Sequence, residues 1–141
     1  MSNKDNHIYT LHRYFIWANR LRDHFRAEVQ SQGPPPDDPS ERGKWLIGPF
    51  GYFSMWMGML YVVIEGWMDL RLSHPGVEKL IKEDNVRILK RYRNGVYHFQ
   101  KTYFDRRCLE FIDKGDPIAD WADDLHDELS NFFLEWYSSR E

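Results

Sequence analysis

The segment RNGVYH holds an arginine and a histidine, Arg93 and His98, that could act together on a phosphodiester. Arginine binds phosphate through a planar, permanently charged guanidinium, and histidine takes or gives a proton near neutral pH. Such a pair could cleave RNA without a metal ion. The imidazole would remove the proton of the ribose 2′-hydroxyl or protonate the leaving 5′-oxygen, and the guanidinium would stabilise the charge that develops on the phosphorane.

The spacing of the two residues limits how they can meet. In a straight α-helix a five-residue step turns about 500°, so the side chains of Arg93 and His98 would point roughly 140° apart. Asn94 and His98, four residues apart, would share a helix face. The site therefore requires a break near Gly95, a long reach by Arg93, or residues from a second subunit.

This segment resembles the motif of the HEPN superfamily. That motif is an arginine, a polar residue that is often Asn, three further residues and a histidine, placed late in an all-α domain of about this length. Arg93, Asn94 and His98 match it position by position. The resemblance implies a metal-independent endoribonuclease without a cofactor, in which Arg93 and His98 are catalytic and Asn94 orients the phosphate by hydrogen bonding.

The same resemblance implies partners and a biological setting. HEPN domains usually form homodimers, in which two copies of the motif face each other across one cleft. Many are toxins of toxin–antitoxin, abortive-infection or CRISPR-linked defence systems, so an antitoxin or another regulatory protein is an expected partner beside RNA. Many also keep an acidic residue on an earlier helix, and Glu65 could play that part here.

The distribution of charge favours a nucleic-acid ligand at the same place. The formal net charge is −3, yet residues 79–107 hold nine basic residues against three acids. A basic stretch in a mildly acidic protein suggests a local site for a phosphate polymer, although its bases could instead pair with the acidic residues 108–141. Tyr97 could stack on a base or pack against the bundle. The bases expected to track the RNA strand are Lys90, Arg91, Lys101, Arg106 and Arg107.

Helical periodicity predicts the elements that position these residues. Apolar residues recur at three- and four-residue steps over residues 5–30 and again over 118–136. The nearly continuous apolar run 50–72 predicts a central helix, or one that packs on a second subunit; Glu65 lies inside it and, if buried, needs an arginine partner. We expect one all-α domain over residues 1–141, a HEPN-like bundle of four main helices with short additional helical pieces.

Capping and breaking residues predict where the helices end. Residues 31–43 hold four prolines and two glycines and predict a loop between the first two helices. Asp84 is the expected N-cap of the helix that carries the motif. Asp116 as N-cap and Pro117 at the first helical position are expected to open the last helix.

Composition excludes several other classes of protein. Cys108 is the single cysteine, so neither an intramolecular disulfide nor a cysteine-rich zinc site can form. No uninterrupted apolar run reaches the roughly 18 residues that suggest a membrane span, and the start of the chain lacks the apolar stretch of a signal peptide. We therefore expect a cytoplasmic protein without a membrane partner.

Two alternatives concern the whole chain. One is a HEPN-like module without activity that docks a partner or an antitoxin, in which Arg93 pairs with Glu65 or with the acidic last helix and His98 is half-buried. The other follows from residues 14–20, which faintly resemble the first helix of DinB-like metal-binding bundles. Such a site wants two histidines one helical turn apart, and the six histidines contain no such pair.

A last candidate is the acidic face of the final helix. Asp120, Asp124 and Asp127 stand at i, i+4 and i+7 and share one face. Carboxylates in this arrangement could hold Mg²⁺, but acids on the outer face of a helix are usually solvated. We expect this face to attract a basic partner, an antitoxin included, and we expect no metal site.

Overall fold

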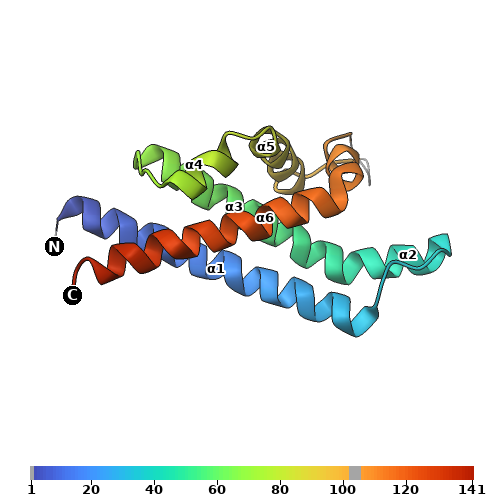
Figure 1. Ribbon diagram of the computed structural model, residues 1–141. Coiled ribbons are helices and arrows are strands. Elements are labelled where there is room, and N and C mark those ends of the chain that lie inside the picture. The colour runs from blue at the N-terminus through green and yellow to red at the C-terminus, as the bar shows by residue number, and fades with distance from the viewer. Residues whose placement is uncertain (1, 102–105) are drawn as a thin grey trace.

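The architecture comes from a computed structural model that describes residues 2–101 and 106–141; of Leu46 and residues 106–116 it describes the backbone alone. Every element in those ranges is a helix (Figure 1), which confirms the expected all-α bundle of four main helices with shorter pieces. The long helices are α1 (Asn3–Gln32), α3 (Gly51–Asp69), α5 (Asn85–Val96) and α6 (Arg106–Ser138). The short pieces are α2 (Pro39–Trp45), the π-helix η1 (Leu46–Phe50) and α4 (Pro75–Ile81).

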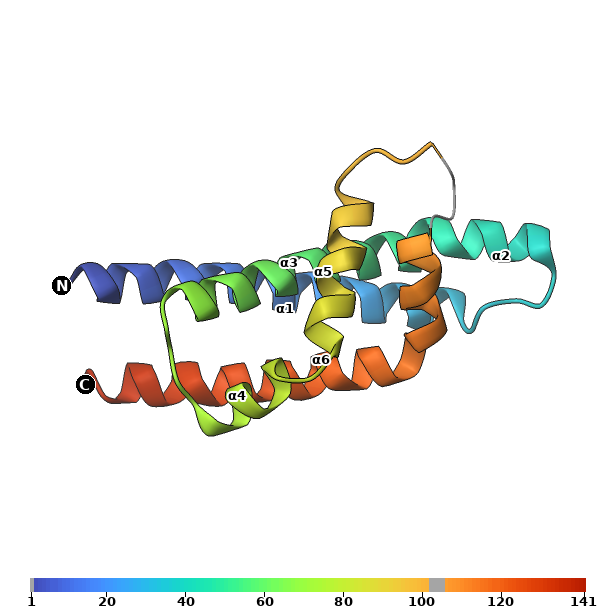
Figure 2. The ribbon, with the colours of Figure 1, turned by 90° about the horizontal axis from the view of Figure 1, so that it is seen from above.

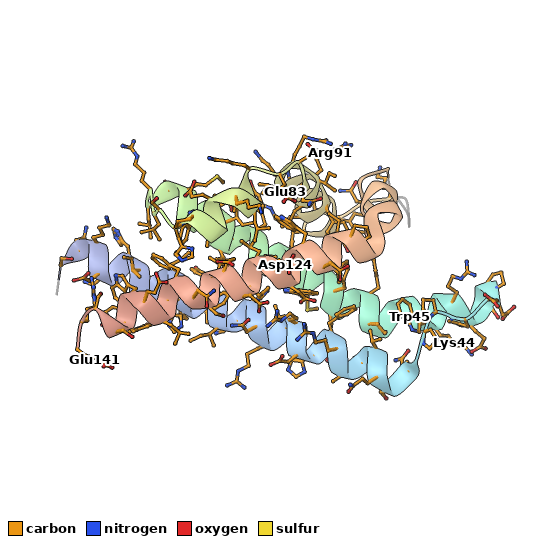
Figure 3. All side chains as sticks on the ribbon, viewed as in Figure 1. Lys44, Trp45, Glu83, Arg91, Asp124 and Glu141 are labelled. Atoms are coloured by element: carbon orange, nitrogen blue, oxygen red, sulfur yellow. The ribbon has the colours of Figure 1, made fainter. Side chains whose placement is uncertain are left out.

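The long helices form a layered arrangement with one helix lying across the others. α1 and α3 pack along each other, and α6 runs beside them, so that both termini lie at the same end (Figure 2). α5 crosses this layer and contacts both α3 and α6, while α4 packs on α6. α2 projects beyond the bundle, where the Trp45 Nε1–H donates to the Gly33 carbonyl at 2.8 Å (Figure 3).

The predicted apolar stripes form the core. α1 and α6 each bury one stripe, because apolar residues at three- and four-residue steps fall on a single helix face. α3 lies between α1 and α5, yet Met55 and Met68 are each 48% exposed, so its apolar surface is only partly covered by this chain. The buried residues of these three helices include Ile8, Leu11, Phe15, Ala18, Trp56, Met57, Leu60, Val63, Ile64, Trp67, Ile118, Trp121, Ala122, Leu125, Leu129 and Phe133.

The loop after the first helix is shorter than predicted. α1 extends to Gln32, and Pro39 is the first residue of α2, so the loop covers residues 33–38 rather than 31–43. Proline is tolerated at the first helical position, because its missing N–H would have no partner there in any case. A helix therefore begins inside a proline-rich segment whose composition predicted a loop throughout.

The last helix begins earlier in the chain than predicted. α6 begins at Arg106 and contains Pro117, so the expectation that Asp116 and Pro117 open this helix is wrong. Figure 2 shows that α6 bends between its first part and the remainder. A proline inside a helix produces such a bend, because it removes one backbone donor and its ring clashes with the preceding turn.

The N-cap of α5 is only partly as predicted. Asp84 occupies the N-cap position, but its side chain makes no capping hydrogen bond. The carboxylate instead accepts hydrogen bonds from Arg87 Nε at 2.8 Å and from Arg87 Nη2 at 3.0 Å. An arginine one turn later thus competes with the backbone for the same oxygens.

A buried histidine of α6 links this helix to α1 and α3. His126 Nε2 accepts a hydrogen bond from Trp56 Nε1 at 2.8 Å, and its Nδ1 lies 2.6 Å from Asn19 Oδ1. Since an indole only donates and an amide oxygen only accepts, the imidazole is neutral and carries its proton on Nδ1. Burial, with smaller contributions from Arg22 and Arg26, lowers the pKa of His126 from 6.5 to about 3.

This histidine predicts a specific loss of stability in acid. Below about pH 6.5 the unfolded chain takes up a proton at His126 that the native state refuses until about pH 3, so the group destabilises the fold as the pH falls. The stability advantage of the wild type over His126→Gln should therefore shrink by about 2 kcal/mol between about pH 6.5 and about pH 4.5. Urea unfolding of both proteins at the two pH values measures this difference, and a difference that stays constant would contradict the assignment.

Candidate active site at the end of helix α5

The apolar face of α5 positions the candidate motif. Ile88, Leu89 and Tyr92 are buried, so the helix docks on α3 and α6, and the Tyr92 hydroxyl hydrogen-bonds with that of Ser54. The helix continues without a break through Gly95 and ends at Val96, so of the three expected alternatives the break near this glycine is absent. A glycine in the last turn costs about 1 kcal/mol of helix stability, which the buried face offsets. His98 therefore follows directly after the helix end.

Arg93 lies against α3 rather than in open solvent. Its Cζ is 4.8 Å from the centre of the Tyr61 ring, and its Nη1 is 4.0 Å from Glu65 Oε1. The arginine side chain is 28% exposed, and its buried Nε has no hydrogen-bond partner among the described residues. A guanidinium above an aromatic face is held by the negative electrostatic potential of the ring quadrupole, which leaves the edge of the guanidinium free for other hydrogen bonds.

The tyrosine side chains near Arg93 stay uncharged at neutral pH. Burial raises the pKa of the Tyr61 hydroxyl, the Glu65 carboxylate raises it further, and the Arg93 guanidinium opposes both. Burial likewise raises the pKa of Tyr97, again opposed by Arg93. Both tyrosines therefore stay protonated at neutral pH, and the charged groups of this cluster are Arg93 and Glu65.

Glu65 is neither buried nor tightly paired. Its side chain is 48% exposed, so it is not the buried carboxylate that would require an arginine partner, although Arg93 is its neighbour. A separation of 4.0 Å at the surface corresponds to a weak ion pair. Sequence reasoning did not select Tyr61, although it lies four residues before Glu65 and so shares its helix face.

Tyr97 both packs and remains accessible. Its ring lies on Gly58 of α3, where a Cβ atom would overlap it, and its hydroxyl donates to the Met55 carbonyl at 3.5 Å. The residue is nevertheless 54% exposed. Tyr97 thus closes the end of α5 on α3 and presents part of an aromatic ring to solvent.

The other two members of the motif lie apart from Arg93. His98 is exposed, which differs from the half-buried histidine expected for a purely structural role, and Asn94 is partly buried. Within the described ranges neither side chain makes a hydrogen bond or ion pair, and neither contacts Arg93 by such a bond. In one copy of the chain, Arg93 of α5 therefore packs against α3, and the His98 imidazole lies beyond the end of α5. No described interaction joins the two side chains.

Four of the predicted RNA-binding residues lie within α5 or after its end: Lys90 and Arg91 in the helix, and Tyr97 and Lys101 beyond it. Lys90 and Lys101 are exposed, and Arg91, which is partly buried, lies on the α5 side of the bundle (Figure 3). The side chains of Arg106 and Arg107 lie outside the described residues. Phe99, which sequence reasoning passed over, is 93% exposed and adds an aromatic ring to the same end; its position next to the motif histidine was the available signal.

The acidic face of α6 is solvated. Asp120, Asp124 and Asp127 are exposed, and Figure 3 shows Asp124 on α6. Among the residues that the structure describes, no group of three or more His, Cys, Asp or Glu side chains is placed to hold a metal ion. This holds for the DinB-like alternative as well as for the acidic face.

One helical stretch has the length and composition of a membrane span. It covers Pro39–Asp69, with a mean hydropathy of 1.4 over its most apolar window. Half of that window is buried inside the bundle, as expected for the core helix of a globular protein, and such a stretch is by itself weak support for a membrane span.

Comparison with known proteins adds no relative. No protein family, curated protein or solved structure matches the chain. The function is therefore inferred from the geometry of this chain's own residues: a supported arginine, an accessible histidine and a basic, aromatic surface.

The contact between Gly58 and Tyr97 predicts that Gly58→Ala changes stability in opposite directions with and without the Tyr97 ring. Gly58→Ala should destabilise the wild type by about 1–3 kcal/mol, because the new methyl group forces Tyr97 off α3. In a Tyr97→Ala background the same change should be neutral or stabilise by up to about 1 kcal/mol, because alanine is the better helix former. Denaturant unfolding of the four proteins tests this, and equal effects in both backgrounds would show that Tyr97 does not pack on Gly58.

Proposed function

We propose that the chain is a metal-independent endoribonuclease of the HEPN type, with RNGVYH as its catalytic segment. The observation that carries the proposal is the contrast between its arginine and its histidine. Arg93 is held on Tyr61 with part of its side chain open to solvent, whereas His98 is exposed and its imidazole has no hydrogen-bonding partner among the described residues. A fixed cation and an unengaged imidazole suit the binding of a phosphate and the transfer of a proton.

The proposed reaction is a transesterification. The ribose 2′-hydroxyl attacks the adjacent phosphorus, and the bond to the 5′-oxygen of the next nucleotide breaks. His98 removes the proton of the attacking hydroxyl or supplies one to the leaving oxygen, while Arg93 stabilises the charge on the phosphorane and Asn94 orients the phosphate. The products are a 2′,3′-cyclic phosphate and a 5′-hydroxyl.

A homodimer belongs to this proposal. Within one copy, Arg93 contacts α3 while His98 lies beyond the helix end, with no hydrogen bond or ion pair between them in the described residues. A second copy of the motif across a shared cleft would supply further groups to the same phosphate. Met55 of α3 is partly exposed and lies near Tyr97, so it provides apolar surface beside this site.

Substrate binding would combine charge with stacking. Lys90 and Lys101 are exposed bases, and Tyr97 and Phe99 offer accessible rings at the same end of α5. Single-stranded RNA is commonly bound in this way, because every base can stack on an aromatic ring and every phosphate carries charge. A cytoplasmic toxin or defence effector, controlled by an antitoxin or another protein, is the setting we propose.

The second candidate is a HEPN-like binding module without activity. The contact of Arg93 with Glu65 favours it, since a structural arginine would be paired in this way. Stability separates the two. A structural role predicts that Arg93→Ala lowers the free energy of unfolding by about 1 kcal/mol or more, whereas a catalytic role predicts lost activity with little change in stability.

Cleavage of RNA in EDTA tests the proposed function. The wild type should cleave, and His98→Ala should lower the rate by about 100-fold or more, the usual contribution of a general acid or base. His24→Ala is the matched control, because His24 is also exposed but stacks on Tyr52, away from the motif. Activity that requires a divalent metal, or that survives the loss of His98, would contradict the proposal.

The salt dependence of RNA binding tests the basic surface. If Lys90 contacts a phosphate, Lys90→Ala should reduce the slope of log K against log salt by about 0.7. Lys44→Ala should leave the slope unchanged, because Lys44 lies on the projecting α2 and pairs with Glu41 (Figure 3). Fluorescence anisotropy with a single-stranded oligonucleotide measures both slopes, and equal reductions would indicate unspecific attraction to the whole chain.

A further inference from the structure

A groove lies along the contact between α1 and α3, beside the candidate site. It has a volume of about 810 Å³ and is lined by residues of both helices. The two helices approach closely at Gly66, where a Cβ atom would lie 2.6 Å from Leu11 Cδ1. Both of these residues belong to the lining, so the close approach forms part of the floor of the groove.

The lining is apolar and anionic at once. Tyr14, Tyr61 and Val62 provide aromatic and aliphatic surface, and Glu65 and Asp69 provide two exposed carboxylates. The lining contains no lysine or arginine. Among the described residues Asp69 has no ion pair or side-chain hydrogen bond, and Glu65 has only the distant Arg93. An occupant that suits these walls carries positive charge on an apolar surface.

The spacing of the carboxylates indicates the shape of that occupant. Glu65 and Asp69 are four residues apart, which places them one helical turn, or about 6 Å, from each other. The α3 side of the lining extends from Tyr61 to Leu70, a rise of about 14 Å. A helix of about three turns with basic residues at i and i+4 and apolar residues on the same face matches both dimensions.

The described helices of this chain do not match that occupant. α2 has two bases in its last turn but is only seven residues long, too short for three turns. α5 carries four bases and no acid, but its apolar face is buried on α3 and α6. Arg13, on the exposed side of α1, stacks over the rings of Tyr14 and Trp17 at 5.4 Å and 5.1 Å. A basic helix from another protein is therefore favoured over a second copy of this chain.

The groove and the candidate site share two side chains. Tyr61 and Glu65 line the groove, and the same two residues contact Arg93. A cation that enters the groove competes with Arg93 for the Glu65 carboxylate. Occupancy of the groove is thus coupled to the placement of Arg93.

We propose that the α1–α3 groove is the docking site for a basic amphipathic helix of a partner protein, and that this helix acts on Arg93 through Glu65. Binding of such a helix does not require RNA cleavage, so the two proposals are tested separately.

The test uses a fluorescein-labelled peptide of fourteen residues, acetylated and amidated, with two arginines at i and i+4 and leucines on the same face. Anisotropy should show saturable binding to the full chain, and Glu65→Gln/Asp69→Asn should weaken it by about tenfold or more. Asp23→Asn/Asp37→Asn is the matched control, because it removes the same charge from exposed positions that neither line the groove nor belong to the acidic face of α6, and it should change the affinity less than about twofold. Arg93→Ala should tighten binding severalfold, because Glu65 loses its competitor.

Several results would overturn the proposal. Absence of saturable binding would do so, as would equal weakening by the two double variants, which would indicate attraction by net charge alone. An unchanged affinity in Arg93→Ala would refute the coupling. Sedimentation velocity of wild type and Glu65→Gln/Asp69→Asn tests the other possible occupant, a second copy of this chain. A dimer that dissociates in the double variant would assign the groove to that second copy and not to a partner helix.

Discussion

Two glycines of α3 let neighbouring side chains lie directly against this helix, and one of them bears on the candidate site. Gly66 lets α1 pack against α3 at Leu11, and Gly58 lets the Tyr97 ring close the end of α5 on the same helix. A Cβ atom at either position would have to displace the side chain that lies there, the tip of Leu11 or the Tyr97 ring. Arg93 lies over Tyr61 in the last turns of α5, whose end Tyr97 closes on α3, so Gly58 supports the geometry of the candidate site.

Sequence patterns predicted the helices better than their ends. The apolar stripes of α1 and α6 identify buried faces correctly, because burial depends on periodicity that a single sequence displays. The boundaries near Pro39 and Pro117 were missed, since a proline can begin a helix or bend one and only tertiary packing decides between them. The site was predicted as a set of residue types; the support of Arg93 by Tyr61 joins two helices distant in sequence and could not be read from local spacing.

One helix thus contributes to the two surfaces of our proposals. Toward α5, Tyr61 and Glu65 contact Arg93, the arginine of the proposed RNA site. Toward α1, the same two residues line the groove that we propose as the docking site of a basic helix. Because Glu65 is exposed and only weakly paired, it can respond to either neighbour. If both proposals hold, partner binding in the groove would act directly on Arg93.

In the mechanism we propose, Arg93 and His98 promote attack by a ribose hydroxyl on the neighbouring phosphate. Mass spectrometry of the fragments released from a defined RNA in EDTA is the decisive experiment, because the chemistry of the new ends records which atom attacked. We expect 2′,3′-cyclic phosphate and 5′-hydroxyl ends, and no cut where the 2′-hydroxyl is replaced by hydrogen. Fragments that end in a 3′-hydroxyl and a 5′-phosphate would contradict it.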